Sequence, residues 1–193
     1  MSTELELKYR LTPEVCALIE EKYAPMAVTT MQTTYYDTRQ GALSARKWTL
    51  RRRLENGISI CTLKTPGQGQ ARGEWEVPCS HIADAIPALI ARGAPGELAG
   101  LTSPGLVQVC AARFTRRAAT VHPEGATVEL ALDQGVLLGS GREKQLLELE
   151  IELKQGDAQA LFTFGRELEQ TYCLVPEPKS KFKRALDLAR EKR

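Results

Sequence analysis

The chain has 193 residues, of which 42% are hydrophobic and 26% are charged. This length suits one domain with a sizeable core, and the composition excludes a disordered or fibrous protein. The formal net charge of +2 argues against a general nucleic-acid binder, because such proteins carry a clear excess of positive charge. Any anion site must therefore be a local basic cluster that acidic residues balance.

The sequence carries no sign of membrane insertion or export. No apolar run approaches the roughly 18 residues that a spanning helix needs, and the N-terminus does not resemble a signal peptide. The five cysteines are scattered without a CxxC pair, which is typical of packed, reduced thiols in a cytoplasmic protein. With only His81 and His122, a histidine-rich zinc site is not expected. We therefore expect a cytoplasmic protein.

The first half of the chain predicts mainly strands. Charged and apolar residues alternate over residues 1–11, and side chains on a strand alternate between its faces. Thr12 and Pro13 then suit the N-cap and first position of a helix. Asn56-Gly57 is a strong signal for a hairpin turn. Further strands are expected over 31–36, 48–54, 58–65 and 73–77.

The second half predicts both helices and long strands. Ser80 is expected to cap a helix that runs to Arg92, interrupted by Pro87, and the Gly/Pro-rich residues 94–104 read as a loop. Asp157 and Ser180 begin two further helices, and strands are expected over 106–120, 127–133 and 145–154. The sum predicts an α+β fold: a mainly antiparallel β-barrel of about eight strands with flanking helices, in a single domain over 1–193.

Acidic residues recur on one face of several predicted strands. A single Glu-x-Glu pair is usually a solvated strand face, but three such groups opposite apolar faces indicate a site. Clustered carboxylates are the ligands that Mg²⁺ or Mn²⁺ prefers, often shared with substrate phosphates. The groups are Glu4 with Glu6, Glu74 with Glu76, and Glu148 with Glu150 and Glu152.

Basic residues alternate in the same way, and such side chains clamp phosphate oxygens. Taken alone, the run from Arg51 to Arg53 also fits a basic surface, and the cations around Lys181 also fit a charged helix surface. Arg113 and Arg116 cannot both point inward on one regular strand. The candidate phosphate ligands are Lys8, Arg51, Arg53, Lys64, Arg72, Arg113, Arg116 and Lys181.

These motifs resemble the CYTH superfamily, also called triphosphate tunnel metalloenzymes, and they occur in family order across nearly the whole chain. Glu4-x-Glu6-x-Lys8 resembles the N-terminal ExExK signature. The later matching segments are Tyr35-Tyr36-Asp37-Thr38, Leu50-Arg51-Arg52-Arg53, Thr62-Leu63-Lys64-Thr65-Pro66, Arg72-Gly73-Glu74-Trp75-Glu76, Phe114-Thr115-Arg116, Glu129 to Asp133, Glu148 to Lys154, and Ser180-Lys181.

The resemblance implies an eight-stranded antiparallel tunnel with a metal on one side and a triphosphate on the basic side. It implies hydrolysis of a triphosphate or, in some members, cyclisation of ATP. We expect an inorganic triphosphatase that depends on Mg²⁺ or Mn²⁺, with catalytic roles for Lys8, Arg51, Arg53 and Glu150. The expected metal ligands are Glu4, Glu6, Glu74, Glu76, Asp133, Glu148, Glu150 and Glu152.

Several alternatives stay open at this point. The same tunnel could serve an adenylate cyclase, a thiamine triphosphatase with Trp48 stacking on thiamine, or a non-catalytic polyphosphate-binding module. Trp48 more often packs in a core. Arg52 stands where the family has a small or aliphatic residue. Related bacterial proteins often carry a further helical domain, so the chain is expected to be a single-domain member or a fragment. A homodimer is also open.

Overall fold

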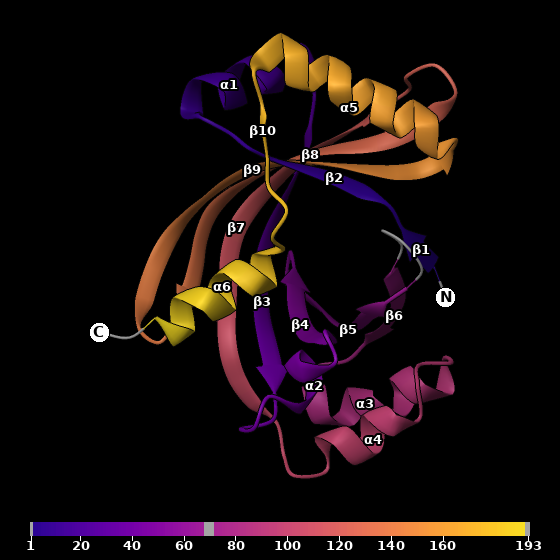
Figure 1. Cartoon of the computed structure of the whole chain (residues 1–193), viewed down its shortest axis with the longest axis vertical. Coiled ribbons are helices and arrows are strands. Elements are labelled where there is room, and N and C mark those ends of the chain that lie inside the picture. The colour runs from indigo at the N-terminus through magenta and orange to yellow at the C-terminus, as the bar shows by residue number, and fades with distance from the viewer. Residues whose placement is uncertain (1, 68–71, 192–193) are drawn as a thin grey trace.

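The computed structural model describes residues 2–67 and 72–191. Ten strands form one antiparallel sheet in the order β1-β6-β5-β4-β3-β7-β8-β9-β2-β10 (Figure 1). The strands are β1 Ser2–Glu4, β2 Glu6–Arg10, β3 Ala27–Asp37, β4 Thr49–Glu55, β5 Ile58–Pro66, β6 Arg72–Pro78, β7 Val107–Val121, β8 Ala126–Gly139, β9 Arg142–Gly156 and β10 Val175–Pro176. The helices are α1 Pro13–Lys22, α2 Ala42–Ala45, α3 Ile82–Ala91, α4 Glu97–Thr102, α5 Ala158–Tyr172 and α6 Lys181–Arg190.

The α+β class and the large antiparallel sheet are confirmed, but the closed barrel of eight strands is not. The hydrogen-bonded order is open, with β1 at one end and β10 at the other. The predicted strand over 1–11 is interrupted at Leu5: β1 pairs with β6, whereas β2 pairs with β9. Residues 2–10 therefore pair first with β6, near one end of the sheet order, and then with β9, near the other end. The interruption at Leu5 means that this segment does not close the sheet with one continuous strand.

The helix caps follow the sequence closely. The side chains of Thr12, Asp157 and Ser180 accept hydrogen bonds from the backbone N–H groups at the starts of α1, α5 and α6. These bonds satisfy donors that have no partner within the helix itself. Asn56 and Gly57 form the predicted hairpin turn, both with positive φ.

Some predicted boundaries were wrong. The N-cap of α3 is His81 rather than Ser80, and the helix continues through Pro87. The expected loop over 94–104 contains α4. The strands predicted over 31–36 and 127–133 are longer, because β3 begins at Ala27 and β8 extends to Gly139. Pairing with neighbouring strands extends them beyond what local patterns indicate.

Three apolar clusters hold the fold together. Helices α2 to α4 pack on β4 to β6, and α1 and α5 pack on β2, β8 and β9, at opposite ends of the molecule in Figure 1. Helix α6 packs instead on β3, β7, β8 and β9 through residues such as Phe114, Leu137 and Leu186. Phe114 and Leu137 share strand parity with Arg116 and Asp133, so α6 covers part of the charged face.

Close backbone contacts fix the position of α6. A Cβ at Gly139 of β8 would lie 2.6 Å from the Ala189 nitrogen and 2.7 Å from the Ala185 oxygen. Only glycine allows α6 to approach β8 so closely. Within the described ranges, no helix is both long and apolar enough to cross a membrane.

Candidate functional site: a charged cavity

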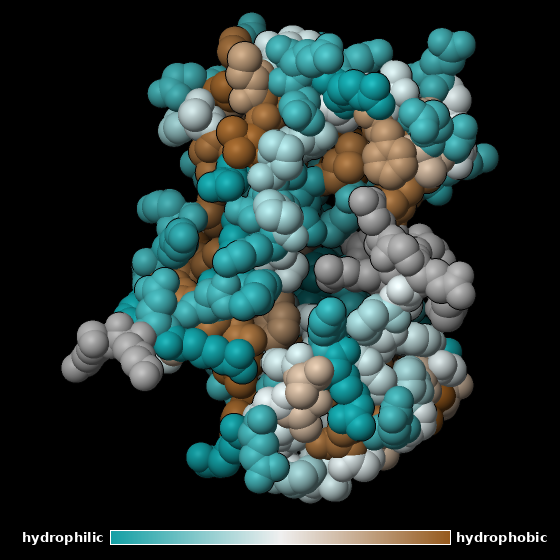
Figure 2. All heavy atoms as spheres, in the orientation of Figure 1, coloured by the Kyte–Doolittle hydropathy of each residue, from teal (hydrophilic) through white to brown (hydrophobic). Residues whose placement is uncertain are grey.

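The inner face of the sheet lines a cavity of about 440 Å³. Residues of β2 to β9 contribute to it, together with Ser180, Lys181 and Phe182 at the start of α6. In Figure 2 a hydrophilic hollow lies near the middle of the molecule, between its two ends. The alternation predicted from sequence is confirmed here, because the charged residues face the cavity and their apolar neighbours face the outer cores.

One wall of the cavity carries three cations, with carboxylates of the same wall beside them. Arg51 and Arg53 project from β4, and Lys64 projects from β5. Glu74 Oε1 lies 3.3 Å from Lys64 Nζ and 3.6 Å from Arg51 Nη2, while Arg53 donates to Glu55 at 2.9 Å. Burial, followed by the neighbouring charge of Arg51, lowers the pKa of Arg53. An anion between these side chains would relieve the repulsion between the two guanidinium groups.

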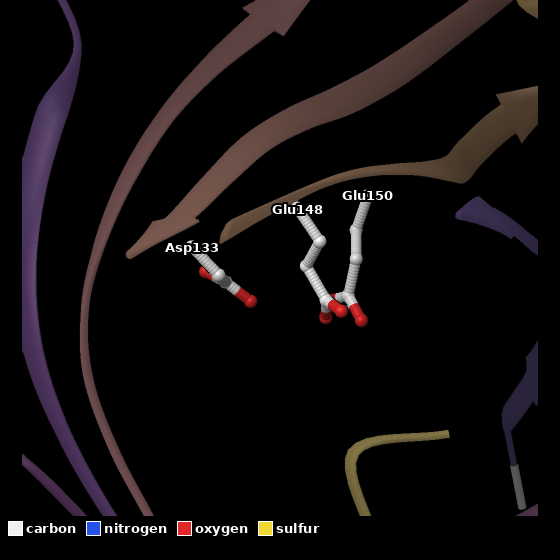
Figure 3. Close-up of side chains that lie close together, drawn as sticks. All are labelled: Asp133, Glu148 and Glu150. Carbon is white, nitrogen blue, oxygen red and sulfur yellow. The ribbon is translucent and has the colours of Figure 1, made fainter. Parts of the chain in front are cut away.

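The opposite wall contains a buried ionic cluster. Carboxylate oxygens of Asp133, Glu148 and Glu150 lie within 4.8 Å of one another and point into the same space (Figure 3). The ammonium of Lys181 lies among them, 2.6 Å from Asp133 Oδ2 and 2.8 Å from Glu150 Oε1, and also pairs with Glu148. Arg116 donates two hydrogen bonds to Asp133, at 2.8 and 2.7 Å, and also pairs with Glu150.

The cations and carboxylates of this cluster stabilise one another's charged forms. Burial alone would lower the pKa of Lys181, but the three carboxylates outweigh it and raise that pKa. Burial alone would raise the pKa of Glu150, but Lys181 and Arg116 hold it well below its usual range. Burial raises the pKa of Glu148, although Lys181 opposes the shift. Cations engage all three carboxylates, but Asp133 and Glu148 are fully buried, whereas Glu150 also lines the cavity.

A second acidic group is more open. Glu6, Glu152 and Glu129 lie directly opposite one another on β2, β9 and β8. Their side chains are 21%, 27% and 32% exposed and line the cavity. Like charges directly opposite on neighbouring strands are destabilising. Lys8 contacts Glu6 at 2.9 Å and Lys154 contacts Glu152 at 2.8 Å. We call Glu6, Glu129 and Glu152 the acidic row.

Glu129 was absent from the predicted site. It shares strand parity with Asp133, which the sequence did mark, so alternation along the strand over 127–133 could have identified it. Its place opposite Glu152 depends on a register shift between Thr127 and Val128, which local sequence does not reveal.

The structure brings most of the predicted residues together but not all of them. Of the two arginines that cannot both point inward, Arg116 lines the cavity, and Arg113 lies on the other face of β7, 58% exposed and paired with Glu143. Alternation along one strand separates it from Arg116. Trp48 is buried in the core under α2 to α4, where it cannot stack on a ligand in the cavity. Arg52 donates a hydrogen bond to the Ser80 carbonyl. The Glu4 and Arg72 side chains lie outside the described part.

A family model for the CYTH domain matches residues 2–186. The chain belongs to the CYTH domain family. A protein from Haemophilus influenzae named inorganic triphosphatase is 30% identical over 173 residues, which cover 85% of this chain and 49% of that protein. The chain thus spans about half the length of this curated relative.

Solved structures share the CYTH fold at low sequence identity. A putative adenylyl cyclase from Hippeastrum, described as having a dominant triphosphatase activity, superposes with a TM-score of 0.67 and 15% identity, covering 99% of this chain and 98% of that one. The PH1819 protein from Pyrococcus horikoshii gives a TM-score of 0.62 at 21% identity, covering 96% and 99%. These likenesses show the fold alone.

Proposed function

We propose that this CYTH protein is a metal-dependent inorganic triphosphatase that splits tripolyphosphate into pyrophosphate and phosphate. One observation carries the proposal: the cations Arg51, Arg53 and Lys64 and the acidic row face the same 440 Å³ cavity. Tripolyphosphate carries about four to five negative charges near neutral pH, so several convergent cations are needed to replace its water. The relative named inorganic triphosphatase supports this choice of substrate.

The basic residues would hold the phosphate chain. Arg51, Arg53 and Lys64 form one side of the cavity, and Lys8 and Arg116 face it from other strands. One guanidinium group can bind two phosphate oxygens at once, whereas an ammonium group acts as a compact point charge. Fixing the chain at several points aligns its terminal phosphorus for attack by water, which is the main protein contribution in phosphoryl transfer.

The carboxylates that face the cavity suit a hard divalent cation. Glu6, Glu129, Glu150 and Glu152 offer oxygen donors, the ligands that Mg²⁺ and Mn²⁺ favour. Asp133 and Glu148 are less suited, because both are fully buried and, unlike Glu150, do not line the cavity. When bound, the metal would neutralise phosphate charge and lower the pKa of a coordinated water.

Phosphate release from tripolyphosphate, ATP and thiamine triphosphate, each with Mg²⁺, Mn²⁺ or excess chelator, tests this function. We expect metal-dependent release that is fastest from tripolyphosphate, with little cyclic AMP from ATP. The described aromatic residues that line the cavity, Tyr35 and Phe182, pack against each other with centroids 5.1 Å apart rather than offering a free ring to adenine. Cyclic AMP as the main product from ATP would favour a cyclase, and binding without turnover would favour a non-catalytic module.

A further inference from the structure

We propose that Arg184 is a positioning residue for the polyphosphate cavity. It shares the charge of Glu148 with Lys181 from the side away from the cavity, so that less of the Lys181 charge is cancelled beside the phosphate chain. The inference rests on the proposed function, because it takes the cavity as the polyphosphate site. Arg184 follows Lys181 by three residues on α6, a spacing that places both side chains on the same side of a helix.

Glu148 lies between these two cations. Its Oε1 pairs with Lys181 Nζ, and its Oε2 accepts a hydrogen bond from Arg184 Nη2. The carboxylate is fully buried, and the Arg184 side chain is 12% exposed. Arg184 Nη1 also lies 3.7 Å from Glu177 Oε2. A buried carboxylate thus links one helix residue that lines the cavity to another that does not.

Arg184 faces a different space from Lys181. It lines a separate groove of about 310 Å³, together with residues such as Arg10, Glu177 and Asp187, whereas Lys181 lines the central cavity. Arg184 is therefore placed to influence a ligand in the cavity through Glu148 rather than by touching it.

Arg184 is one of three cations that engage Asp133, Glu148 and Glu150, and the other two are Arg116 and Lys181. Two further carboxylates lie close by, Glu129 at 3.8 Å from Arg116 and Glu177 at 3.7 Å from Arg184. Without Arg184 the cluster would become more negative beside an anion site, and Lys181 alone would have to satisfy both Glu148 oxygens. Charges in such a buried place are weakly screened, so the loss should reach the cavity.

Isothermal titration of tripolyphosphate in excess chelator tests this role without depending on turnover. Arg184→Met should raise the Kd on the order of tenfold, and Arg184→Gln, which keeps an N–H donor while losing the charge, should shift the Kd in the same direction. Arg184→Lys should restore most of the affinity.

The matched control is Arg117→Met, which removes a similarly buried arginine that pairs with Glu20 on the outer face. It should leave the Kd unchanged.

A double-mutant cycle tests the route through Glu148. In the Glu148→Gln background, once a melting curve has shown that the single and double variants remain folded, Arg184→Met should change the Kd by less than about twofold, because the partner through which it acts has lost its charge. An unchanged Kd in folded Arg184→Met and Arg184→Gln proteins, or fully additive effects in the cycle, would overturn the positioning role. Wild-type binding without phosphate release would contradict the proposed hydrolysis, while weaker binding by Arg184→Met would still support the role of Arg184.

Discussion

At the scale of single residues, the acidic side chains divide into two kinds. Asp133 and Glu148 are fully buried and compensated by cations, whereas Glu6, Glu129 and Glu152 line the cavity with part of their surface exposed. Removing a compensated carboxylate leaves buried cations unpaired, which is strongly destabilising. Removing one from the acidic row loses an ion pair with a lysine but also reduces repulsion between neighbouring carboxylates, so its larger effect should fall on chemistry.

Glu6→Gln should therefore lower metal-dependent hydrolysis of tripolyphosphate on the order of 100-fold while leaving thermal stability nearly unchanged, because an amide is a poorer ligand for a hard cation. Phosphate release at saturating Mg²⁺ and a melting curve would check both parts. Glu143→Gln is the matched control, since Glu143 is exposed and pairs with Arg113 away from the cavity. Wild-type turnover by Glu6→Gln would remove Glu6 from the metal-ligand set.

The cysteines give a second prediction at this scale. Burial raises the pKa of Cys61 and of Cys110 to about 12, whereas Cys173 is exposed. Because the thiolate is the reactive form, iodoacetamide at pH 8 should label Cys173 at least about tenfold faster than either buried thiol. Peptide mass spectrometry over time would measure this. Equal labelling of Cys61 and Cys173 in folded protein would contradict the packing.

The raised pKa values of Cys61 and Cys110 also determine how the free energy of unfolding changes with pH. The folded protein holds these two thiol protons to a higher pH than the unfolded chain does, whose thiols titrate near the ordinary value of 9.0. The unfolded state therefore binds fewer protons above that value, and the free energy of unfolding should fall as the pH rises from about 9 to about 12.

At the scale of elements, α6 connects the fold to the site. Its apolar residues pack on the inner face of the sheet, and its first residue, Lys181, enters the ionic cluster. The sequence predicted the Ser180 cap and the outward and inward faces of the strands, because both depend on local chemistry. It did not predict that Lys181 would occupy the centre of the group formed by Asp133, Glu148 and Glu150, because that contact depends on where a distant helix docks.

Gly139→Ala should test how strongly this docking matters. The added Cβ would approach the α6 backbone to 2.6 Å, so the helix must shift, at a cost of about 1–3 kcal/mol in the free energy of unfolding. Displacement of Lys181 should also weaken tripolyphosphate binding. Gly100→Ala in α4 is the control, because a Cβ added there would meet no described atom within 4 Å, and it should be neutral or slightly stabilising. Urea unfolding and calorimetry would compare them, and equal stability would contradict tight packing of α6.

At the scale of the whole molecule, the curved sheet separates charge from apolar surface. The two outer cores lie under α1 with α5 and under α2 to α4, and the inner face holds the charged cavity beside α6. The sequence predicted this separation from strand parity but not the open strand order, because the break at Leu5 and the pairing of β1 with β6 are long-range events. The cations are consequently spread over several strands rather than gathered on one loop.

That spread predicts a dependence on substrate length. Lys8, Arg51, Lys64 and Arg116 lie on four different strands around the cavity, so a chain of three phosphates can engage more of them at once than pyrophosphate can. Fewer anchors also leave the scissile bond less well aligned, and alignment is a large part of the rate. We expect kcat/KM for tripolyphosphate to exceed that for pyrophosphate by at least about tenfold, with pyrophosphate acting as a competitive inhibitor.

Initial rates of phosphate release at several concentrations of each compound, at one fixed free Mg²⁺ concentration, would measure both values. The comparison should be repeated with Lys64→Met, which removes one anchor and should reduce kcat/KM for tripolyphosphate more than for pyrophosphate. Equal kcat/KM values for the two substrates in the wild-type protein would contradict a cavity in which basic side chains on separate strands bind successive phosphates.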